Sequence, residues 1–458
     1  MLSNSEKLAK LRQYFASGST RSYQFRRQQL EKLKQAIIKY EAEIYRALYS
    51  DLKKSPEDCW ITENGFLLVE INTALKNLRS WMQPKTVKTN LLNFPSSSQI
   101  IQEPLGVVLI IAAWNYPLQL LLVPLVGAIA AGNCAVLKPS EFASATEKLV
   151  VKIIEEIFPE EYVLIVSGDG AEVIPNMLDS FTFDHIFFTG STRVGKIIYQ
   201  LAAAKLIPVT LELGGKSPCV IEADANISVA TRRIAVTKFS NCGQMCIAAD
   251  YVLVHQSQQE NLIRELANTI VNFFGENARL SADYGKIINE KQFDRLIDLL
   301  QDGEIVFGGK TDRENLYIQP TLLTNVSLDA PIMQGEIFGP ILPIIAFSTF
   351  EEALAIIAKN PNPLAFYLFT TKTKTEKKWL ESVQFGGGCI NNNSFHFTNP
   401  SLPFGGRGNS GIGSYHGRFS FENFSHQKAI IKTPLWFNPA LKYPPFKGKL
   451  GLFKLLVR

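Results

Sequence analysis

Residues 187–198 read FFTGSTRVGKII, an apolar run followed by a glycine turn and a helical pattern. This order is typical of a buried strand that leads into a helix, where the backbone N–H groups of the helix N-terminus face an anion. Gly190 and Gly195 occupy the first and last positions of a GxGxxG pattern, but Thr192 replaces the middle glycine. A strict dinucleotide-binding fingerprint is therefore missing, and a purely structural turn explains this piece equally well.

Similar apolar runs occur on both sides of this stretch and alternate with helical segments. The first series is VVLII (107–111), CAVLK (134–138), YVLIV (162–166), HIFFTG (185–190) and PVTLEL (208–213). A second series begins with SPCVIE (217–222) and YVLVH (251–255) and continues to about residue 389. Wholly apolar strands separated by helices indicate parallel sheets covered on both faces, a common scaffold for nucleotide binding. The sequence therefore predicts an α/β fold.

Composition excludes several classes of protein. The chain has 458 residues, of which 46% are hydrophobic and 19% charged, and its net charge is +5, which fits a globular protein and not a nucleic-acid-binding one. Its six cysteines form no CxxC pair, so we expect no metal site and a reducing compartment, the cytoplasm. The first residues, MLSNSEKLAKLRQYF, lack the apolar core of a signal peptide. The apolar run 118–131 is too short to cross a membrane and is expected to form a buried helix.

Polar residues follow several of the apolar runs. Lys138 and Glu141 end CAVLK and can hydrogen-bond a ribose; alternatively, they mark a strand end before a helix that begins at Ser140. Asn115 follows VVLII, and its amide can donate to an oxyanion or simply form a turn. Glu212 lies inside an otherwise apolar strand end, where a buried carboxylate serves either as a general base or as a structural group.

The stretch NCGQMCIAAD (241–250) contains two cysteines, Cys242 and Cys246. Most cysteines are small buried residues, but a thiolate is a strong nucleophile when its surroundings favour ionisation. Cys246 follows a Gly-Gln turn after a helix, which makes it the candidate nucleophile. We interpret Cys242 as structural.

Seven motifs occur together in one order. They are AAWNYP, LKPSE, FFTGSTRVG, LELGGKSP, NCGQMCIA, GEIFGP and LPFGGRGNSGIG. In this order they resemble the NAD(P)-dependent aldehyde dehydrogenase superfamily, and the ending GNSGIGSYHGRFSFENFSHQKAI resembles its class 3, or fatty aldehyde dehydrogenase-like, branch. The resemblance spans about residues 10 to 430.

The resemblance implies a role for each catalytic candidate. Cys246 matches the family nucleophile, which adds to the aldehyde carbon and gives a thiohemiacetal. The Asn115 amide and the Cys246 backbone N–H would hold the oxyanion. After hydride transfer to nicotinamide a thioester remains, and Glu212 would activate the water that hydrolyses it.

The resemblance also implies cofactor and substrate contacts. Lys138 and Glu141 would contact the adenosine ribose, and a carboxylate there favours NAD, with NADP tolerated. Around the rest of the cofactor the implied residues are Gly190 and Ser191 at the pyrophosphate, Val194 near the adenine, Glu336 on the nicotinamide ribose, and Phe338 beside it. Trp114 and Phe404 would line the aldehyde tunnel, although either residue could equally belong to the core.

The fold implied by the resemblance has two doubly wound parallel-sheet domains and a small β oligomerisation segment. A Rossmann-like cofactor domain is expected at 1–84 and 104–210, and a catalytic domain at 211–412. Residues 85–103 and 413–435 would bridge the subunits of a homodimer. The tail, 436–458, is basic and apolar, and it is expected either to lie peripherally on an anionic membrane or to pack over the substrate entrance.

One departure and three alternatives stay open. Class 3 members usually carry Asn-Asp where this chain has Asn391 and Asn392, although the expected His396 follows, so any inference about substrate preference is weakened. The activity we predict is oxidation of medium- to long-chain apolar aldehydes to carboxylic acids. The alternatives are a CoA-acylating aldehyde dehydrogenase or acyl reductase, which needs no water-activating Glu212, a non-catalytic membrane-associated binding protein, and a cysteine hydrolase.

Overall fold

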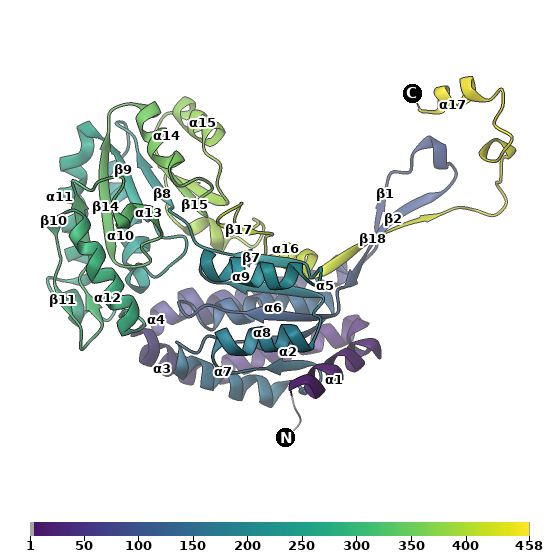
Figure 1. Ribbon diagram of the computed structural model, residues 1–458, viewed down its shortest axis with the longest axis horizontal. Coiled ribbons are helices and arrows are strands. Elements are labelled where there is room, and N and C mark those ends of the chain that lie inside the picture. Colours follow the sequence, from purple (N-terminus) through teal and green to yellow (C-terminus); the bar gives the residue numbers. More distant parts are fainter. Residues whose placement is uncertain (1–3, 458) are drawn as a thin grey trace.

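The computed structural model describes residues 4–457 and contains two large sheets and a projecting arm (Figure 1). The first sheet has six strands in the order β17 (Gly411–Ile412), β7 (Val209–Glu212), β6 (His185–Thr189), β3 (Val107–Ile111), β4 (Cys134–Lys138) and β5 (Val163–Ile165). All are parallel except β17, which pairs antiparallel with β7. The apolar runs of the first series thus form this sheet, as the sequence predicts.

Strand order determines where this sheet can bind a ligand. The chain runs from β3 outward through β4 to β5, then returns to β6 and continues to β7, so the order reverses between β3 and β6. Ligands of open α/β sheets bind beyond the carboxyl ends of the strands at such a point. Asn115, Lys138, Gly190 and Glu212 all lie at or just after those ends.

Helices from the first half of the chain surround this sheet. They are α1 (Asn4–Ala16), α2 (Tyr23–Lys39), α3 (Glu41–Leu52), α4 (Pro56–Cys59), α5 (Gly65–Trp81), α6 (Gln119–Ala131), α7 (Ser144–Ile157), α8 (Gly170–Ser180) and α9 (Thr192–Ala203). Every residue of α6 is buried, as predicted for the apolar run 118–131, because α2, α5 and α16 (Gly417–Asn423) pack around it. None of the helices in residues 4–457 has the length and apolar character that a membrane crossing requires.

The second sheet has seven strands. Their order is β10 (Glu304–Phe307), β13 (Thr321–Thr324), β14 (Ile341–Phe347), β9 (Tyr251–His255), β8 (Pro218–Ile221), β15 (Ala365–Phe369) and β16 (Gly387–Ile390), and only β10 pairs antiparallel. The helices of this half are α10 (Ile227–Phe239), α11 (Gln259–Phe274), α12 (Glu290–Leu299), α13 (Pro331–Gln334), α14 (Phe350–Ala358) and α15 (Thr373–Ser382). A short ribbon of β11 (Thr311–Asp312) and β12 (Tyr317–Ile318) lies apart from both sheets.

The predicted domain boundary at 210/211 falls inside β7. Val209–Glu212 pairs with β6 along its whole length, and β17 at the far end of the predicted second domain returns to pair with Glu212 and Leu211. The backbone of Glu212 therefore belongs to the first sheet. The chain enters the second sheet only at β8.

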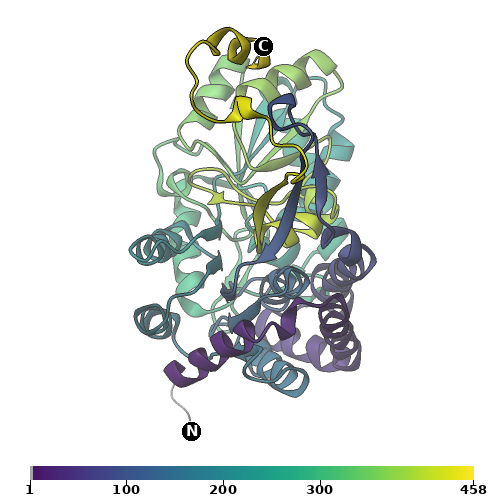
Figure 2. The same ribbon diagram turned by 90° about the vertical axis from the view of Figure 1, so that its right-hand side faces the viewer.

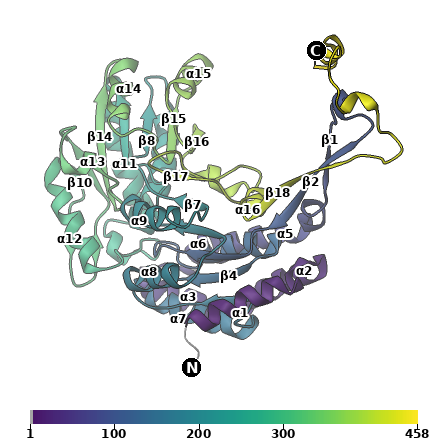
Figure 3. The same cartoon turned by 45° about the vertical axis from the view of Figure 1, so that its right-hand side comes forward.

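The arm is a three-stranded antiparallel sheet of β1 (Lys85–Val87), β2 (Ser97–Pro104) and β18 (Ser425–Lys432). It projects away from both large sheets, and α17 (Leu450–Val457) lies near its tip (Figures 1 and 3). Turning the molecule brings the arm and the C-terminal segment in front of the body (Figure 2). The two segments that the sequence separates by more than 300 residues thus form one structural unit.

Candidate active site

Cys246 lies on a tight turn between α10 and β9. Asn241, Cys242 and Gly243 have φ angles of +47°, +53° and +69°, and this left-handed stretch redirects the chain after the helix. Residues 245–248 then form a turn in which the Ala248 N–H donates to the Met245 carbonyl at 3.0 Å. Cys246 occupies the second position of this turn and is partly exposed, whereas Cys242 is buried, as the sequence interpretation expects.

The Gln244 side chain holds the beginning of this turn in place. Its buried side chain donates to the carbonyls of Asn241 and Lys286, both at 3.0 Å, and accepts from the Ile288 N–H at 3.0 Å. A side-chain amide that makes three bonds to two segments holds them in one relative position. Sequence reasoning missed this residue, although it lies within the NCGQMC motif.

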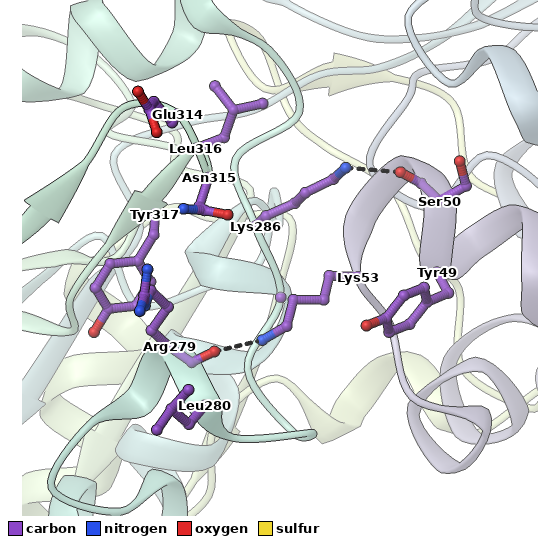
Figure 4. A pocket seen from close by; sticks show the side chains of 11 residues that line it. Tyr49, Ser50, Lys53, Arg279, Leu280, Lys286, Glu314, Asn315, Leu316 and Tyr317 are labelled. Carbon is purple, nitrogen blue, oxygen red and sulfur yellow. Dashed lines mark hydrogen bonds between the residues drawn. The ribbon is translucent and has the colours of Figure 1, made fainter.

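The segment that supports Gln244 is itself attached to the first half of the chain. A cleft of ≈580 Å³ lies between α3 and residues 279–286. Two lysine side chains cross this cleft (Figure 4). Lys286 donates to the Ser50 carbonyl at 2.7 Å, and Lys53 donates to the Arg279 carbonyl at 2.9 Å. Burial lowers the pKa of Lys53. These contacts hold the two halves together behind the nucleophile turn.

Glu212 and Cys246 lie in one site. Glu212 is 3% exposed, and neither of its carboxylate oxygens has a hydrogen-bond partner among residues 4–457. Burial raises the pKa of Glu212 well above its ordinary value. Burial also raises the pKa of the Cys246 thiol, and the nearby charges of Glu336 and Glu212 raise it further. The expected base therefore lies close enough to the expected nucleophile to raise the pKa of its thiol.

Glu336 lies on the same site from the side of the second sheet. Its carboxylate faces the backbone of Gly214, two residues after Glu212. Burial and the nearby Asp250 raise the pKa of Glu336 to about 8, and its Oε1 has no partner within the described chain. Asp250 also accepts from the Ile337 N–H at 2.9 Å and pairs with Lys216, so it fixes the backbone next to Glu336.

Asn115 is buried beside the nucleophile turn. The Asn115 side-chain amide donates to the backbone carbonyl of Gln244 at 3.0 Å. The backbone carbonyl of Asn115 accepts from the Asn241 side-chain amide at 2.8 Å. A side-chain amide carries two N–H groups. One N–H of the Asn115 side chain therefore binds the Gln244 carbonyl, and the amide can donate a second hydrogen bond as well.

The expected tunnel residues lie in two places. The Trp114 and Phe338 rings meet edge to face at 5.2 Å, and Phe338 has a left-handed φ of +50°. Phe404 is 7% exposed and stacks between His416 at 5.1 Å and His396 at 6.0 Å. The structure therefore brings Trp114 to Phe338, while Phe404 belongs to a separate aromatic stack.

The side chains of Asn391 and Asn392 both hydrogen-bond the backbone. The Asn391 side chain accepts from the Thr370 N–H at 3.0 Å and donates to the Thr370 carbonyl at 2.8 Å. The Asn392 side chain accepts from the Asn393 N–H at 2.9 Å. Both side chains therefore make backbone contacts. His396 lies with Nδ1 3.7 Å from Cys389 Sγ.

Lys138 and Glu141 form a pair at the end of β4. Lys138 Nζ lies 3.0 Å from a Glu141 carboxylate oxygen, and the other oxygen accepts from the Gly170 N–H at 3.1 Å. Burial alone raises the pKa of Glu141, but hydrogen bonds from the backbone and from Lys138 bring the pKa below its ordinary value. Glu141 therefore lines a cleft of ≈590 Å³ as a charged carboxylate, together with residues 167–169.

The helix predicted at Ser140 begins later. α7 starts at Ser144, and its first N–H groups, of Ala145 and Thr146, are capped by the Asp51 carboxylate of α3 at 3.0 and 2.8 Å. The prediction of a helix from Ser140 is therefore wrong, because the cap comes from another helix. The loop 139–143 is left free to carry Glu141 beside Lys138.

The turn after β6 brings strand and helix unusually close. A Cβ at Gly190 would lie 2.6 Å from the Phe188 ring, and a Cβ at Gly195 would lie 2.6 Å from Leu213. Ser191 caps α9 by accepting from the Val194 N–H at 3.4 Å. A side chain at either outer position of the imperfect GxGxxG pattern would therefore have to displace Phe188 or Leu213.

These residues fit a nicotinamide dinucleotide. A helix N-terminus after β6, a charged carboxylate at the end of β4 and an unpartnered Glu336 oxygen lie around one strand-order reversal. Among residues 4–457 no group of three His, Cys, Asp or Glu side chains is placed to hold a metal ion.

Comparisons with known proteins identify the family of the chain. Residues 6–430 match the model of the aldehyde dehydrogenase family. The chain is 46% identical to the 4,4'-diaponeurosporen-aldehyde dehydrogenase of Staphylococcus aureus (96% of each chain), and 45% identical to aldehyde dehydrogenase family 3 member A2 of Rattus norvegicus (95% of this chain, 90% of the relative). A solved structure, the substrate-bound state of Staphylococcus aureus AldH, superimposes with a TM-score of 0.98 at 44% identity, covering 100% of both chains. The chain therefore belongs to the aldehyde dehydrogenase family, with class 3 members among its relatives, and is an NAD(P)-dependent oxidoreductase that acts on aldehydes.

Proposed function

We propose that this enzyme oxidises medium- to long-chain apolar aldehydes to carboxylic acids through a covalent intermediate on Cys246. One observation carries the proposal: the buried carboxyl of Glu212, whose two oxygens have no hydrogen-bond partner within residues 4–457, lies beside a partly exposed thiol on a fixed turn. A thiol alone can form an acyl-enzyme, and an adjacent base allows water to release it.

The first half of the reaction is carbon–sulfur bond formation. Cys246 Sγ adds to the aldehyde carbon, and the carbonyl oxygen becomes an oxyanion held by the Asn115 amide and the Cys246 backbone N–H. When bound, NAD(P)⁺ supplies a hydride acceptor and a positive charge that favours the thiolate. Loss of hydride from the thiohemiacetal carbon leaves a thioester on Cys246.

The second half is hydrolysis. Glu212 takes a proton from a water molecule as the water oxygen attacks the thioester carbon. The carbon–sulfur bond then breaks, which releases the carboxylic acid and returns Cys246 as thiolate. Transfer to CoA would need no such base, so Glu212 supports hydrolysis over the CoA-acylating alternative.

An apolar substrate is supported by the rings around the site. Trp114 and Phe338 present aromatic surface beside the cofactor position, and Phe404 is the third aromatic candidate. The staphylococcal relative is named for 4,4'-diaponeurosporen-aldehyde. A panel of saturated aldehydes graded by chain length, extended with polyene aldehydes such as this one, is therefore the test of substrate class; equal kcat/KM for short and long aldehydes would contradict it.

We also propose that NAD is preferred and NADP tolerated. The Glu141 carboxylate is held in its charged form by Lys138 and Gly170, and a charge at the ribose repels a 2′-phosphate. The ratio of kcat/KM for NAD to kcat/KM for NADP should fall about tenfold when Glu141 is replaced with Gln, because the charge that repels the 2′-phosphate is lost. A wild-type preference for NADP would contradict the charge argument.

The exposed arm is the main support for our proposal that the protein forms a homodimer. It projects from the body, and its β18 edge strand is largely exposed (Figure 1). Beyond it, Leu435 and Trp436 are 99% and 78% exposed, more apolar surface than an isolated chain usually leaves in water. Light scattering should give twice the mass of one chain, and removing residues 433–458 separates assembly through the arm from assembly through the tail.

For the tail, peripheral contact with an anionic membrane stays the proposal. Residues 436–458 contain Lys and Arg but no Asp or Glu, and Leu450 is 64% exposed. Co-sedimentation with vesicles that contain anionic lipid, compared with neutral vesicles, tests it. The six free cysteines support a reducing compartment such as the cytoplasm.

The decisive experiment is Cys246→Ala with Cys242→Ala as its control. Cys246→Ala should abolish NADH formation from aldehyde while cofactor affinity changes little, and Cys242→Ala should keep turnover. Both enzymes are assayed with and without CoA, because strict dependence on CoA would favour the acylating alternative. Normal turnover by Cys246→Ala would remove the proposed nucleophile.

A further inference from the structure

The carbonyl of Ile247, directly after the nucleophile, accepts two side-chain hydroxyls. Tyr367 Oη donates at 2.6 Å and Ser394 Oγ at 2.8 Å. Tyr367 and Ser394 are 0% and 2% exposed, and Ile247 is 4% exposed, so no bulk water competes for this carbonyl. A carbonyl oxygen has two lone pairs, and here both are used by the protein.

The two hydroxyls hold one end of a peptide group whose other end is also held. The Ala248 N–H, which shares that peptide group with the Ile247 carbonyl, donates to the Met245 carbonyl at 3.0 Å. The Met245 carbonyl shares a peptide group with the Cys246 N–H, so this hydrogen bond ties the Met245–Cys246 peptide group to the held Ile247–Ala248 peptide group. Burial raises the pKa of the Cys246 thiol, and the backbone N–H groups of Cys246 and Ile247 act in the opposite direction by lowering it.

The two hydroxyls come from other elements than the segment that Gln244 binds. Tyr367 lies in the middle of β15, inside the seven-stranded sheet, and Ser394 follows β16 with a left-handed φ of +62°. Ser394 is itself fixed, since its hydroxyl lies 3.1 Å from Asn393 Oδ1 and 3.4 Å from Tyr367 Oη. Gln244 and Asn241 hold the beginning of the turn, and this pair holds its end.

We propose that Tyr367 and Ser394 are positioning residues for the nucleophile: by binding the Ile247 carbonyl they hold the turn, and with it the Cys246 sulfur and the neighbouring backbone N–H groups, in one arrangement. The proposal rests on the proposed role of Cys246. It adds that β15 and the segment after β16, which contact neither the aldehyde nor the cofactor in the proposed mechanism, set the reactivity of the thiol.

The test uses Tyr367→Phe, which removes only the hydroxyl, and Ser394→Ala. Two quantities are measured on the full-length enzyme: kcat with aldehyde and NAD, and the pH dependence of Cys246 alkylation by iodoacetamide, followed by mass spectrometry of the Cys246 peptide. Less effective N–H donation raises the thiol pKa, so the alkylation midpoint should move up by about half to one pH unit. We expect kcat to fall about tenfold, with KM for NAD unchanged.

Thr321→Val is the matched control. Thr321 is 0% exposed in the same sheet, and its hydroxyl donates to the Gln319 carbonyl at 2.7 Å, away from the turn. The Thr321→Val variant should be less stable than wild type, but the pH midpoint of its Cys246 alkylation should be unchanged. An unchanged midpoint in both Tyr367→Phe and Ser394→Ala, or an equal shift in Thr321→Val, overturns the proposal. Because alkylation needs no turnover, it reports on the turn even if the proposed oxidation fails; should Tyr367→Phe not fold, Ser394→Ala decides.

Discussion

The Glu336 carboxylate lies so close to the backbone of Gly214 that a Cβ at Gly214 would meet Oε2 at 1.8 Å and the carboxylate carbon at 2.4 Å. Gly214 follows Glu212 by two residues, so the loop from the second sheet reaches the end of the first sheet. The absence of a side chain at Gly214 is what permits this approach. The expected cofactor contact and the expected base are therefore structurally coupled.

Gly214→Ala should displace Glu336. The new methyl group cannot share space with the carboxylate, so we expect kcat/KM for NAD to fall about tenfold to a hundredfold. Steady-state kinetics with varied NAD measure this, and NADH fluorescence gives the affinity. Gly335→Ala is the control in the neighbouring loop, because a Cβ there meets nothing within 4 Å. Equal losses in both variants would contradict displacement as the cause.

Glu212→Gln should separate the two halves of the reaction. Carbon–sulfur bond formation and hydride departure do not need this carboxylate, whereas hydrolysis does. We expect a rapid burst of about one NADH per active site, followed by a steady rate about a hundredfold or more below wild type. Since the pKa of Glu212 is raised, the wild-type steady rate should rise with pH as the base ionises. A full steady rate in the variant would contradict the assignment.

Glu70, which has no part in the proposed reaction, should make the free energy of unfolding depend on pH. It is 3% exposed, accepts from the Gly417 N–H at 2.8 Å, and burial raises its pKa from 4.5 to about 7. The folded protein thus binds the proton more tightly than the unfolded chain. The stabilisation is complete below pH 4.5 and is lost as pH rises through 7, a change of up to about 3 kcal/mol.

The measurement for Glu70 is urea unfolding of wild type and Glu70→Gln at several pH values. Gln stays neutral, so the free energy of unfolding of the variant should gain on wild type by up to about 3 kcal/mol between pH 5 and pH 8. A difference that is the same at every pH would show that Glu70 does not titrate in this range.

Strands and the buried helix were predictable because their signal is local. The runs 107–111, 134–138 and 251–255 are strands over those same residues, and the apolar run 118–131 forms buried α6. Burial on both faces requires continuous apolar residues, so the pattern needs no partner to be recognised. The catalytic candidates were likewise found from local motifs and the resemblance, and the structure brings Glu212, Asn115 and Glu336 around Cys246.

The features that the sequence did not predict depend on contacts between segments that are far apart in the chain. Nothing near Gln244 in the sequence indicates that it bonds residues 286–288, and nothing near Tyr367 indicates Ile247. The boundary expected at 210/211 fell inside β7 because pairing with β6 and β17 decides where a strand ends. Such partners come from the fold, so local patterns cannot identify them.

The start of α7 allows an experiment to compare a cap predicted from local sequence with a cap supplied by a distant residue. The sequence favours Ser140 as a cap, but the structure has Asp51, 94 residues away from Ala145, accepting from the N–H groups of Ala145 and Thr146 and from the Thr146 hydroxyl. Asp51→Ala should therefore lower the free energy of unfolding by about 2 kcal/mol, whereas Ser140→Ala should lower it by less than about 0.5 kcal/mol. Chemical denaturation of both variants measures the two losses. A larger loss in Ser140→Ala than in Asp51→Ala would restore the local cap, because only a cap made by Ser140 would then explain the start of the helix.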